Sequence, residues 1–273
     1  MRSRRCVADW TVSLHGRATR RPVTLKGVTL SIVACEREER VVGAAVTSCA
    51  IAAGRRTLHV RSGVGAAVAQ ASSEIAWGEE LLDRLGGGAD ARLAIEPFKR
   101  GTSQVAVIDF SGAYAVHTGE FCDPHAGHAS ARDVVAQANT AAQPDAWQRM
   151  IDAYLDSKGP LAERMVAALA ASGGDARGQQ AAAVIVTGTH PLRGYPDEPH
   201  VDLRVDDHRD PVAELQRLLA LHRAHCTMRA IDHLDGPERI RTIGAMLSVH
   251  PGDPHLESTL RRLTSSTGAD TPP

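Results

Sequence analysis

The densest group of charged side chains in the sequence lies between residues 202 and 208, and its residue types could do chemistry. The group consists of Asp202, Arg204, Asp206, Asp207 and His208. On a β-strand, Asp202, Arg204 and Asp206 share one face, which makes Arg204 a candidate to bind a substrate carboxylate. Two carboxylates and an imidazole are also a donor set for a hard divalent metal. Alternatively, Asp207 or Asp210 caps the following helix and Arg204 pairs with its neighbours, and we favour that structural role.

A thiol and two imidazoles lie close together at Cys122, His125 and His128. This spacing is compatible with a zinc site, but the sequence offers no evident fourth ligand, so we favour a structural loop. A thiolate nucleophile at Cys122 with His128 as its base is the alternative. We predict no bound metal and no cofactor.

Hydrophobic patterning predicts the strands that would position such residues. Alternating or continuous apolar segments rich in small residues predict strands at 29–34, 41–47, 64–70, 104–110, 113–118, 181–187 and 201–205. The first two strands form a hairpin around the polar stretch 36–40, and Ser111-Gly112 joins another pair. Strands that are apolar on nearly every residue are typical of a sheet covered on both faces.

Helical periodicity predicts the remaining elements. Ser72 or Ser73 is expected to cap a helix that ends at Gly86. Further helices are predicted from Asp145, from Pro160 and from Asp210-Pro211, with short ones over 232–249 and 256–263 and an unstructured tail at 264–273. Because the predicted hairpins join antiparallel strands, they exclude a doubly wound parallel sheet. The order indicates an α+β fold with two mainly antiparallel sheets packed face to face and helices outside.

Composition narrows the class of partner. The 31 basic and 32 acidic side chains give a net charge of −1, which provides no general attraction for nucleic acid or for an acidic membrane. No apolar stretch approaches the ~20 residues of a membrane helix. The five cysteines are odd in number and widely spaced, so we expect no disulfide framework and a cytoplasmic location.

The first 28 residues differ from the rest of the chain. Through position 27 they contain seven basic residues and a single acid, Asp9. We predict a disordered extension, and the alternatives are a later translation start or a propeptide removed by self-cleavage. The domains expected are this extension, a main domain at 29–225, and a short helical appendage with its tail at 226–273.

Several short segments, taken in order, carry a resemblance. They are TLSIVA at 29–34, GAAV at 43–46, QVAVID at 104–109, HTGEFC at 117–122, QAN at 137–139, GGDARGQQAA at 173–182 and DLRVDDHRDPVAEL at 202–215. In this order and spacing, residues 28–223 resemble a bacterial family of unknown function, DUF1028, that is grouped by structure with the N-terminal-nucleophile (Ntn) hydrolases. The resemblance implies a four-layer αββα sandwich.

The resemblance also implies a nucleophile at Thr29. An N-terminal threonine can act as its own base, because its α-amine has a pKa of about 7.7–8 and can accept the hydroxyl proton. A peptide nitrogen is not basic, so this role requires Thr29 to be the first residue of the working chain. Otherwise Thr29 is an ordinary strand residue.

Other site residues follow from the same comparison. Asn139, in the segment QAN at 137–139, is the candidate donor to an oxyanion, and a plain loop cap is its alternative role. Ser31, Ser48, Gln70 and Gln137 are candidate substrate-binding residues. Many relatives have Lys at the position of Cys49, so a cation that would support the nucleophile is missing.

Two hypotheses about function remain open, and the sequence does not decide whether the protein is an enzyme. The first is an Ntn-type hydrolase of a small amide or peptide-like bond. The second is a protein of the same fold that binds a small acidic ligand, or serves in assembly, without catalysis. A metal-assisted hydrolase using Asp206 and His208 is a weaker third. Because Ntn-type proteins often assemble, we also expect a homo-oligomer.

Overall fold

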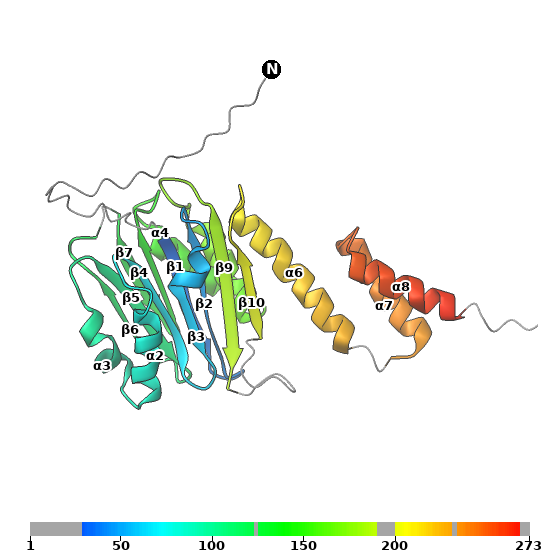
Figure 1. Cartoon of the computed structure of the whole chain (residues 1–273), viewed down its shortest axis with the longest axis horizontal. Helices are drawn as coiled ribbons and strands as arrows, with labels where there is room; N and C mark the ends of the chain where they lie inside the picture. Colours follow the sequence, from blue (N-terminus) through cyan, green and yellow to red (C-terminus); the bar gives the residue numbers. More distant parts are fainter. Residues whose placement is uncertain (1–28, 123–124, 190–199, 231–233, 268–273) are drawn as a thin grey trace, which may run out of the picture.

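The computed structural model describes residues 29–122, 125–189, 200–230 and 234–267 (Figure 1). The predictions made for residues 1–28 therefore lie outside the described residues. Within these ranges, ten strands form two antiparallel sheets, one of six strands in the order β10-β9-β2-β1-β8-β7 and one of four in the order β3-β4-β5-β6. We call the larger one sheet A and the smaller one sheet B.

The strand predicted at 29–34 lies at the centre of sheet A. The strands of this sheet are β1 (Thr29–Glu36), β2 (Val41–Ser48), β7 (Gly127–Ala131), β8 (Val134–Asn139), β9 (Ala181–Gly188) and β10 (Val201–Val205). Sheet B consists of β3 (Leu58–Arg61), β4 (Gly65–Ala71), β5 (Ser103–Asp109) and β6 (Tyr114–Thr118). Because β1 pairs with β2 on one side and β8 on the other, Thr29 is hydrogen-bonded into the sheet from the first residue of the strand.

Helices cover the outer faces of both sheets. On sheet A lie α4 (Ala146–Asp156), α5 (Leu161–Ala171) and α6 (Pro211–Ala230); on sheet B lie α2 (Trp77–Gly86), α3 (Ala91–Ile95) and the 3-10 turn η1 (Glu96–Phe98). The sheets contact each other mainly through β1 and β2 on one side and β3, β4 and β5 on the other (Figure 1). The predicted four-layer αββα sandwich is therefore confirmed.

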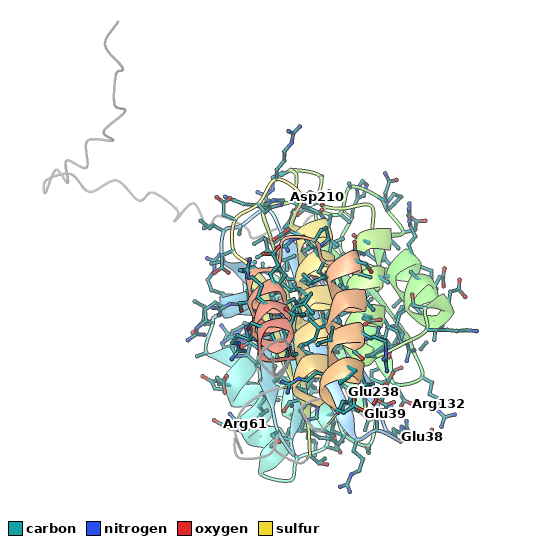
Figure 2. The ribbon with its side chains drawn as sticks, turned by 90° about the vertical axis from the view of Figure 1, so that its right-hand side faces the viewer. Glu38, Glu39, Arg61, Arg132, Asp210 and Glu238 are labelled. Atoms are coloured by element: carbon teal, nitrogen blue, oxygen red, sulfur yellow. The ribbon has the colours of Figure 1, made fainter. Side chains whose placement is uncertain are left out.

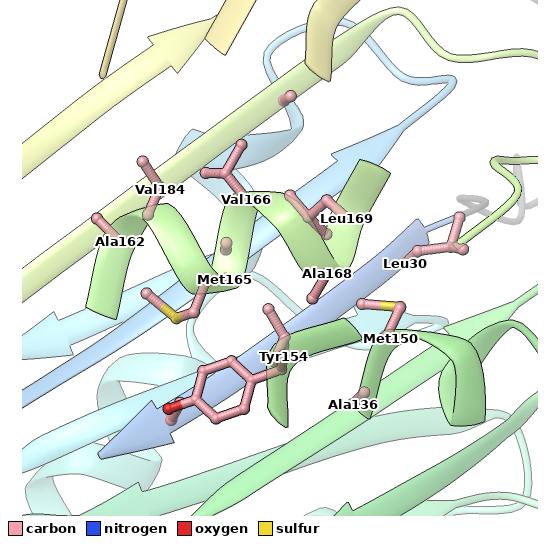
Figure 3. Close-up of a cluster of buried hydrophobic side chains, with 14 of the residues drawn as sticks. Leu30, Ala136, Met150, Tyr154, Ala162, Met165, Val166, Ala168, Leu169 and Val184 are labelled. Atoms are coloured by element: carbon pink, nitrogen blue, oxygen red, sulfur yellow. The ribbon is translucent and has the colours of Figure 1, made fainter. Parts of the chain in front are cut away.

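The core between α4, α5 and sheet A combines long apolar side chains with many alanines (Figure 3). Met150, Met165 and Leu169 of the helices and Leu30 of β1 all belong to this core, and all four are at most 1% exposed. Burying a side chain of this size contributes roughly 1.5–3 kcal/mol. Gly43 of β2 permits the close approach of α5, because a Cβ atom there would lie 2.6 Å from Met165 Cε.

Strand alternation then separates apolar from polar side chains along β1. Leu30 and Ile32 point toward the helices, and Thr29, Ser31 and Val33 point toward sheet B. The space between the sheets is apolar at the β1–β2 turn, and it becomes polar at the end where Thr29 lies. In Figure 2, Glu38 and Glu39 of the β1–β2 turn lie near the bottom of the molecule and Asp210 lies at its top.

The predicted strands agree with the structure to within two residues at each end. The helix cap predicted at Ser72 or Ser73 is wrong: α2 begins after Ala76, and Ser73 Oγ donates to the Gln70 carbonyl over 2.6 Å. A polar side chain close in sequence to a helix can satisfy a strand carbonyl instead of a helix N–H.

The C-terminal region forms a helical hairpin of α7 (Gly236–Val249) and α8 (Pro254–Thr267), where the side chains of Ile243 and Leu256 pack together. The tail predicted to be unstructured from 264 is wrong for its first residues, since α8 continues through Thr267. The predicted domain boundary after residue 225 falls within α6. In the described part of the chain, no helix has both the length and the apolar character needed to cross a membrane.

Candidate functional site

A cavity of about 360 Å³ opens at the polar end of the sandwich, where β1 begins. Its lining comes from the first residue of β1, the end of β2, the short helix α1 (Ala53–Thr57), and the end of β4 with the loop that follows. The lining residues are Thr29, Ser48, Ala50, Ala53, Arg56, Thr57, Ala69, Gln70, Ala71, Ser72, Ser73, Glu74 and Ile75. The cavity therefore includes three of the predicted site residues, Thr29, Ser48 and Gln70.

Thr29 is held firmly at the edge of this cavity. Its side chain lies beside that of Ser48, with 3.5 Å between the two hydroxyl oxygens. Gln70 Nε2 donates to the Thr29 carbonyl over 3.0 Å, so sheet B fixes the residue as well as sheet A. Only 5% of Thr29 is exposed, and that small part faces the cavity.

A network of side-chain amides between the two sheets supports Gln70. Ser31 Oγ donates to Gln70 Oε1 over 2.7 Å, and Gln70 Nε2 donates to Gln104 Oε1 over 2.8 Å. Asn139 Nδ2 donates to the same Gln104 oxygen over 3.0 Å. Gln104 Nε2 donates in turn to the Ala138 carbonyl over 2.9 Å. All four side chains are at most 4% exposed, so each hydrogen bond is made away from solvent.

Gln104 was missed by the sequence analysis, although one signal was present. It is a glutamine at the start of an otherwise apolar strand, and a polar residue in such a position must find partners in the interior. Asn139 and Gln137, which were predicted as site residues, belong to this interior layer. Both are 1% exposed, and neither lines the cavity.

Gln137 is unusual within that layer. Within the described ranges neither atom of its side-chain amide has a hydrogen-bond partner. Because an unpaired buried amide costs about 1–3 kcal/mol, an ordered water between the sheets is the expected partner.

A second missed residue, Asp175, anchors the segment that follows β2. Its carboxylate accepts a 2.7 Å hydrogen bond from the Arg177 N–H and lies against Cys49. Burial raises the pKa of Asp175, and the hydrogen bonds from Arg177 and Cys49 oppose that effect. Because Cys49 directly follows Ser48, this carboxylate fixes the backbone on one side of the cavity. Asp175 lies in the segment GGDARGQQAA at 173–182, one of the segments that carry the family resemblance, and this was the signal that could have identified it.

Two of the six non-glycine residues with positive φ in the described ranges lie beside the cavity. Ala52 has φ 54° immediately before α1, and Ala71 has φ 62° at the end of β4. A non-glycine residue in this left-handed region costs about 1–2 kcal/mol. Such strain persists only where surrounding structure enforces it, and it is often found at functional sites.

Comparison with known proteins assigns the chain to a family. The model of the family of unknown function DUF1028 matches residues 29–215, and its match begins at Thr29. The chain belongs to this family. A crystal structure of another DUF1028 protein, from Silicibacter pomeroyi, aligns with a TM-score of 0.64 and 27% identity, covering 70% of this chain and 88% of that one.

A more distant structure is the ancestral β-subunit Anbu of Yersinia bercovieri. It aligns with a TM-score of 0.34 and 12% identity, covering 73% of this chain and 96% of Anbu. No curated protein matches this DUF1028 chain.

The charged cluster at 202–208 does not line the cavity beside Thr29. Arg204 is on the edge strand β10, where its aliphatic part packs near Gly54 of α1. Asp207 accepts from Gln180 Nε2 over 2.9 Å, and His208 Nδ1 accepts from the Asp210 N–H over 3.0 Å. The backbone carbonyl of Asp206 accepts from the Ala52 N–H over 3.0 Å. The helix cap that we favoured comes from Asp210, whose Oδ1 accepts from the Ala213 N–H of α6 over 3.3 Å, and not from Asp207.

Cys122 and His128 also have separate partners. Cys122 Sγ donates to the Ser103 carbonyl over 3.6 Å, and His128 Nδ1 lies 2.9 Å from Thr118 Oγ1. Burial lowers the pKa of His128, and the nearby His117 lowers it further. Among the residues whose positions are described, no group of three or more His, Cys, Asp or Glu side chains could hold a metal ion.

Proposed function

We propose that this DUF1028 protein is an Ntn-type hydrolase of a small amide or peptide-like bond, with Thr29 as its nucleophile when Thr29 is the first residue. One observation carries the proposal. The hydroxyl-bearing residue that begins the central strand of an αββα sandwich lines a cavity large enough for a small ligand.

The chemistry needs only groups at this end of β1. Thr29 Oγ1 attacks the carbonyl carbon of the amide, and the α-amine of the same residue accepts the hydroxyl proton. That proton passes to the amide nitrogen as the C–N bond breaks, which leaves an ester on Thr29 and releases an amine. Water then attacks the ester, the Thr29 hydroxyl re-forms, and a carboxylic acid leaves. The balance is one amide and one water converted to one acid and one amine.

The surrounding residues position the nucleophile. The Ser48 hydroxyl, 3.5 Å from that of Thr29, is placed to orient the attacking oxygen. Gln70 Nε2 donates to the Thr29 carbonyl. Ser31 and Gln104 bond to Gln70, and Asn139 bonds to Gln104. In this proposal Asn139, Gln137 and Ser31 act from behind the cavity and do not touch the substrate.

The decisive experiment compares four chains: the full sequence, a chain that begins at Thr29, and the Thr29→Ala and Thr29→Ser variants of the shorter chain. The probe is a short peptide epoxyketone, which closes a ring only with a hydroxyl and an amine on the same residue. We expect a mass increase of one probe on the chain that begins at Thr29 and on its Thr29→Ser variant, and none on the other two. Absence of the adduct from the chain that begins at Thr29 would overturn the proposal.

A second candidate function rests on a different observation. In the full sequence Val28 precedes Thr29, and an amide nitrogen there cannot accept the proton. A protein that keeps this bond would use the same cavity to bind a small ligand without turning it over. Ligand binding by the full chain, without hydrolysis by any of the chains, would favour this role. Size-exclusion chromatography with light scattering tests the expected homo-oligomer.

A further inference from the structure

The cavity beside Thr29 carries one positive and one negative side chain. Arg56 lines it from α1, and Glu74 lines it from the loop after β4. These two segments come from opposite sides of the sandwich opening, since α1 follows β2 of sheet A and residues 72–75 follow β4 of sheet B. The other residues that line the cavity are uncharged.

Both charges are available to a ligand. Among the residues that the structure describes, no ion pair joins Arg56 or Glu74 to any carboxylate or cation, including each other. Arg56 donates one hydrogen bond, from Nη2 to the Ile51 carbonyl over 3.2 Å, which leaves most of its guanidinium donors unused. A charged side chain without a partner at the wall of a small cavity is placed to recognise the opposite charge.

The rest of the lining limits the size of the ligand. Ala50, Ala53, Ala69 and Ala71 form much of the wall, and the volume of about 360 Å³ lies near the lower end for ligand pockets. A ligand with only a carboxylate would meet the repulsion of Glu74, and one with only an ammonium would meet that of Arg56. A compact zwitterion satisfies both.

We infer, on the basis of the proposed function, that the substrate is a compact zwitterionic amide whose free carboxylate is bound by Arg56 and whose free ammonium is bound by Glu74. Two kinds of molecule have this chemistry. One is an amino acid that carries the amide on its side chain, so that both α-groups stay free. The other is a dipeptide, which has one charge on each side of the bond that is cut.

The first test measures kcat/KM on the chain that begins at Thr29. The probes are four p-nitroanilides that differ in charge: γ-glutamyl (both charges), glutaryl (carboxylate only), 4-aminobutyryl (ammonium only) and butyryl (neutral). Alanyl-alanine, followed by amine release, separates dipeptides from side-chain amides. We expect kcat/KM for γ-glutamyl or for alanyl-alanine to exceed that of the singly charged and neutral probes by about tenfold or more.

Variants assign the two charges. Arg56→Gln should reduce the ratio of kcat/KM for the zwitterionic probe to that for the ammonium-only probe by about tenfold. Glu74→Gln should reduce the ratio for the zwitterionic probe to that for the carboxylate-only probe by about the same factor. Arg55→Gln on the same helix and Glu80→Gln on α2 are matched controls, because both side chains are exposed and lie outside the cavity lining. A neutral probe that reacts as fast as the zwitterions, or variants that change every probe equally, would overturn the inference.

Binding separates this inference from the hydrolase proposal. Calorimetry with the Thr29→Ala chain uses glutamine as the zwitterion and glutarate as the dianion. Binding of glutamine that weakens in Arg56→Gln and Glu74→Gln supports the zwitterion site even if no chain hydrolyses any probe. Hydrolysis of all probes at similar rates would support the proposed hydrolase function but overturn the inference of a zwitterionic substrate. The inference is also overturned if glutamine does not bind and no probe is hydrolysed in a charge-dependent way.

Discussion

The Oγ1 atom of Thr29 lies 3.5 Å from the Oγ atom of Ser48, across the pairing of β1 with β2. Ser48 Oγ also accepts from the Ala50 N–H over 3.1 Å. Ser48 therefore links the proposed nucleophile to the segment that enters α1. Its hydroxyl can orient Thr29 and at the same time hold one wall of the cavity.

We expect Ser48→Ala to lower kcat/KM of the chain that begins at Thr29 by about tenfold or more, because the attacking hydroxyl loses its neighbour. Unfolding by urea should show a loss of stability of about 1 kcal/mol, the usual worth of such a hydrogen bond. Ser48→Thr keeps the hydroxyl and should recover part of the rate. A rate unchanged in Ser48→Ala would show that this hydroxyl does not orient the nucleophile.

Gln104→Leu should destabilise the protein by about 2–4 kcal/mol in urea unfolding. The change leaves Gln70 Nε2 and Asn139 Nδ2 without the acceptor that they share, and both atoms are buried. Gln148→Leu is the control, because Gln148 is exposed on α4 and bonds to Asp152 near solvent. A loss for Gln104→Leu no greater than that of the control would contradict the role of this network.

Gly43→Ala tests the close packing of α5 on sheet A. The new methyl group would lie 2.6 Å from Met165 Cε and 2.8 Å from the Ile185 carbonyl oxygen, and the latter belongs to a paired strand that cannot withdraw. We expect a loss of about 1–3 kcal/mol in the free energy of unfolding. Gly244→Ala in α7 should instead raise stability by about 0.5–1 kcal/mol, since no atom lies within 4 Å of the added Cβ. Equal effects of the two changes would contradict this account.

Cys35 gives the protein a pH dependence above pH 9. Burial raises the pKa of its thiol from 9.0 to about 11. The folded thiol keeps its proton where the unfolded thiol has lost it, so stability is full below pH 9 and falls as pH rises toward 11. The loss should reach at most about 2–3 kcal/mol, and it should be absent from Cys35→Ala.

Thiol labelling checks the same residue independently. At pH 8, iodoacetamide should alkylate the exposed Cys226 in the native protein and Cys35 only after unfolding, as read by peptide mass spectrometry. Labelling of Cys35 at the rate of Cys226 would contradict its burial.

Seven of the ten described strands were predictable because their patterns are local, whereas β3, β7 and β8 were missed. The segment 29–34 alternates small polar with apolar residues, and 41–46 is apolar throughout, as expected for a strand covered on both faces. The strand β7, with sequence GHASA, escaped prediction because small and polar residues on an edge strand leave no apolar pattern. The short strand β3 has only four residues, and the five-residue helix α1 is too short to show a helical period.

The candidate site was predictable only in part. Thr29, Ser48 and Gln70 line the same cavity, since each lies at or beside the end of a predicted strand. Arg56, Glu74 and Asp175 were missed, because each is an ordinary charged residue in its own segment. Their significance arises only when α1, the loop after β4 and the segment before β9 are brought together by pairing between distant strands.

The pairing of Thr29 with both Ser48 and Asn139 has a consequence for activation. These contacts hold the residue through its own backbone and side chain, whatever is attached to its nitrogen. Release of the Val28–Thr29 bond would then create a basic nitrogen inside a ready-made pocket, with no refolding of the sandwich. The switch from inert precursor to hydrolase would be a single covalent event, visible as a change in mass and in rate while the melting temperature stays the same.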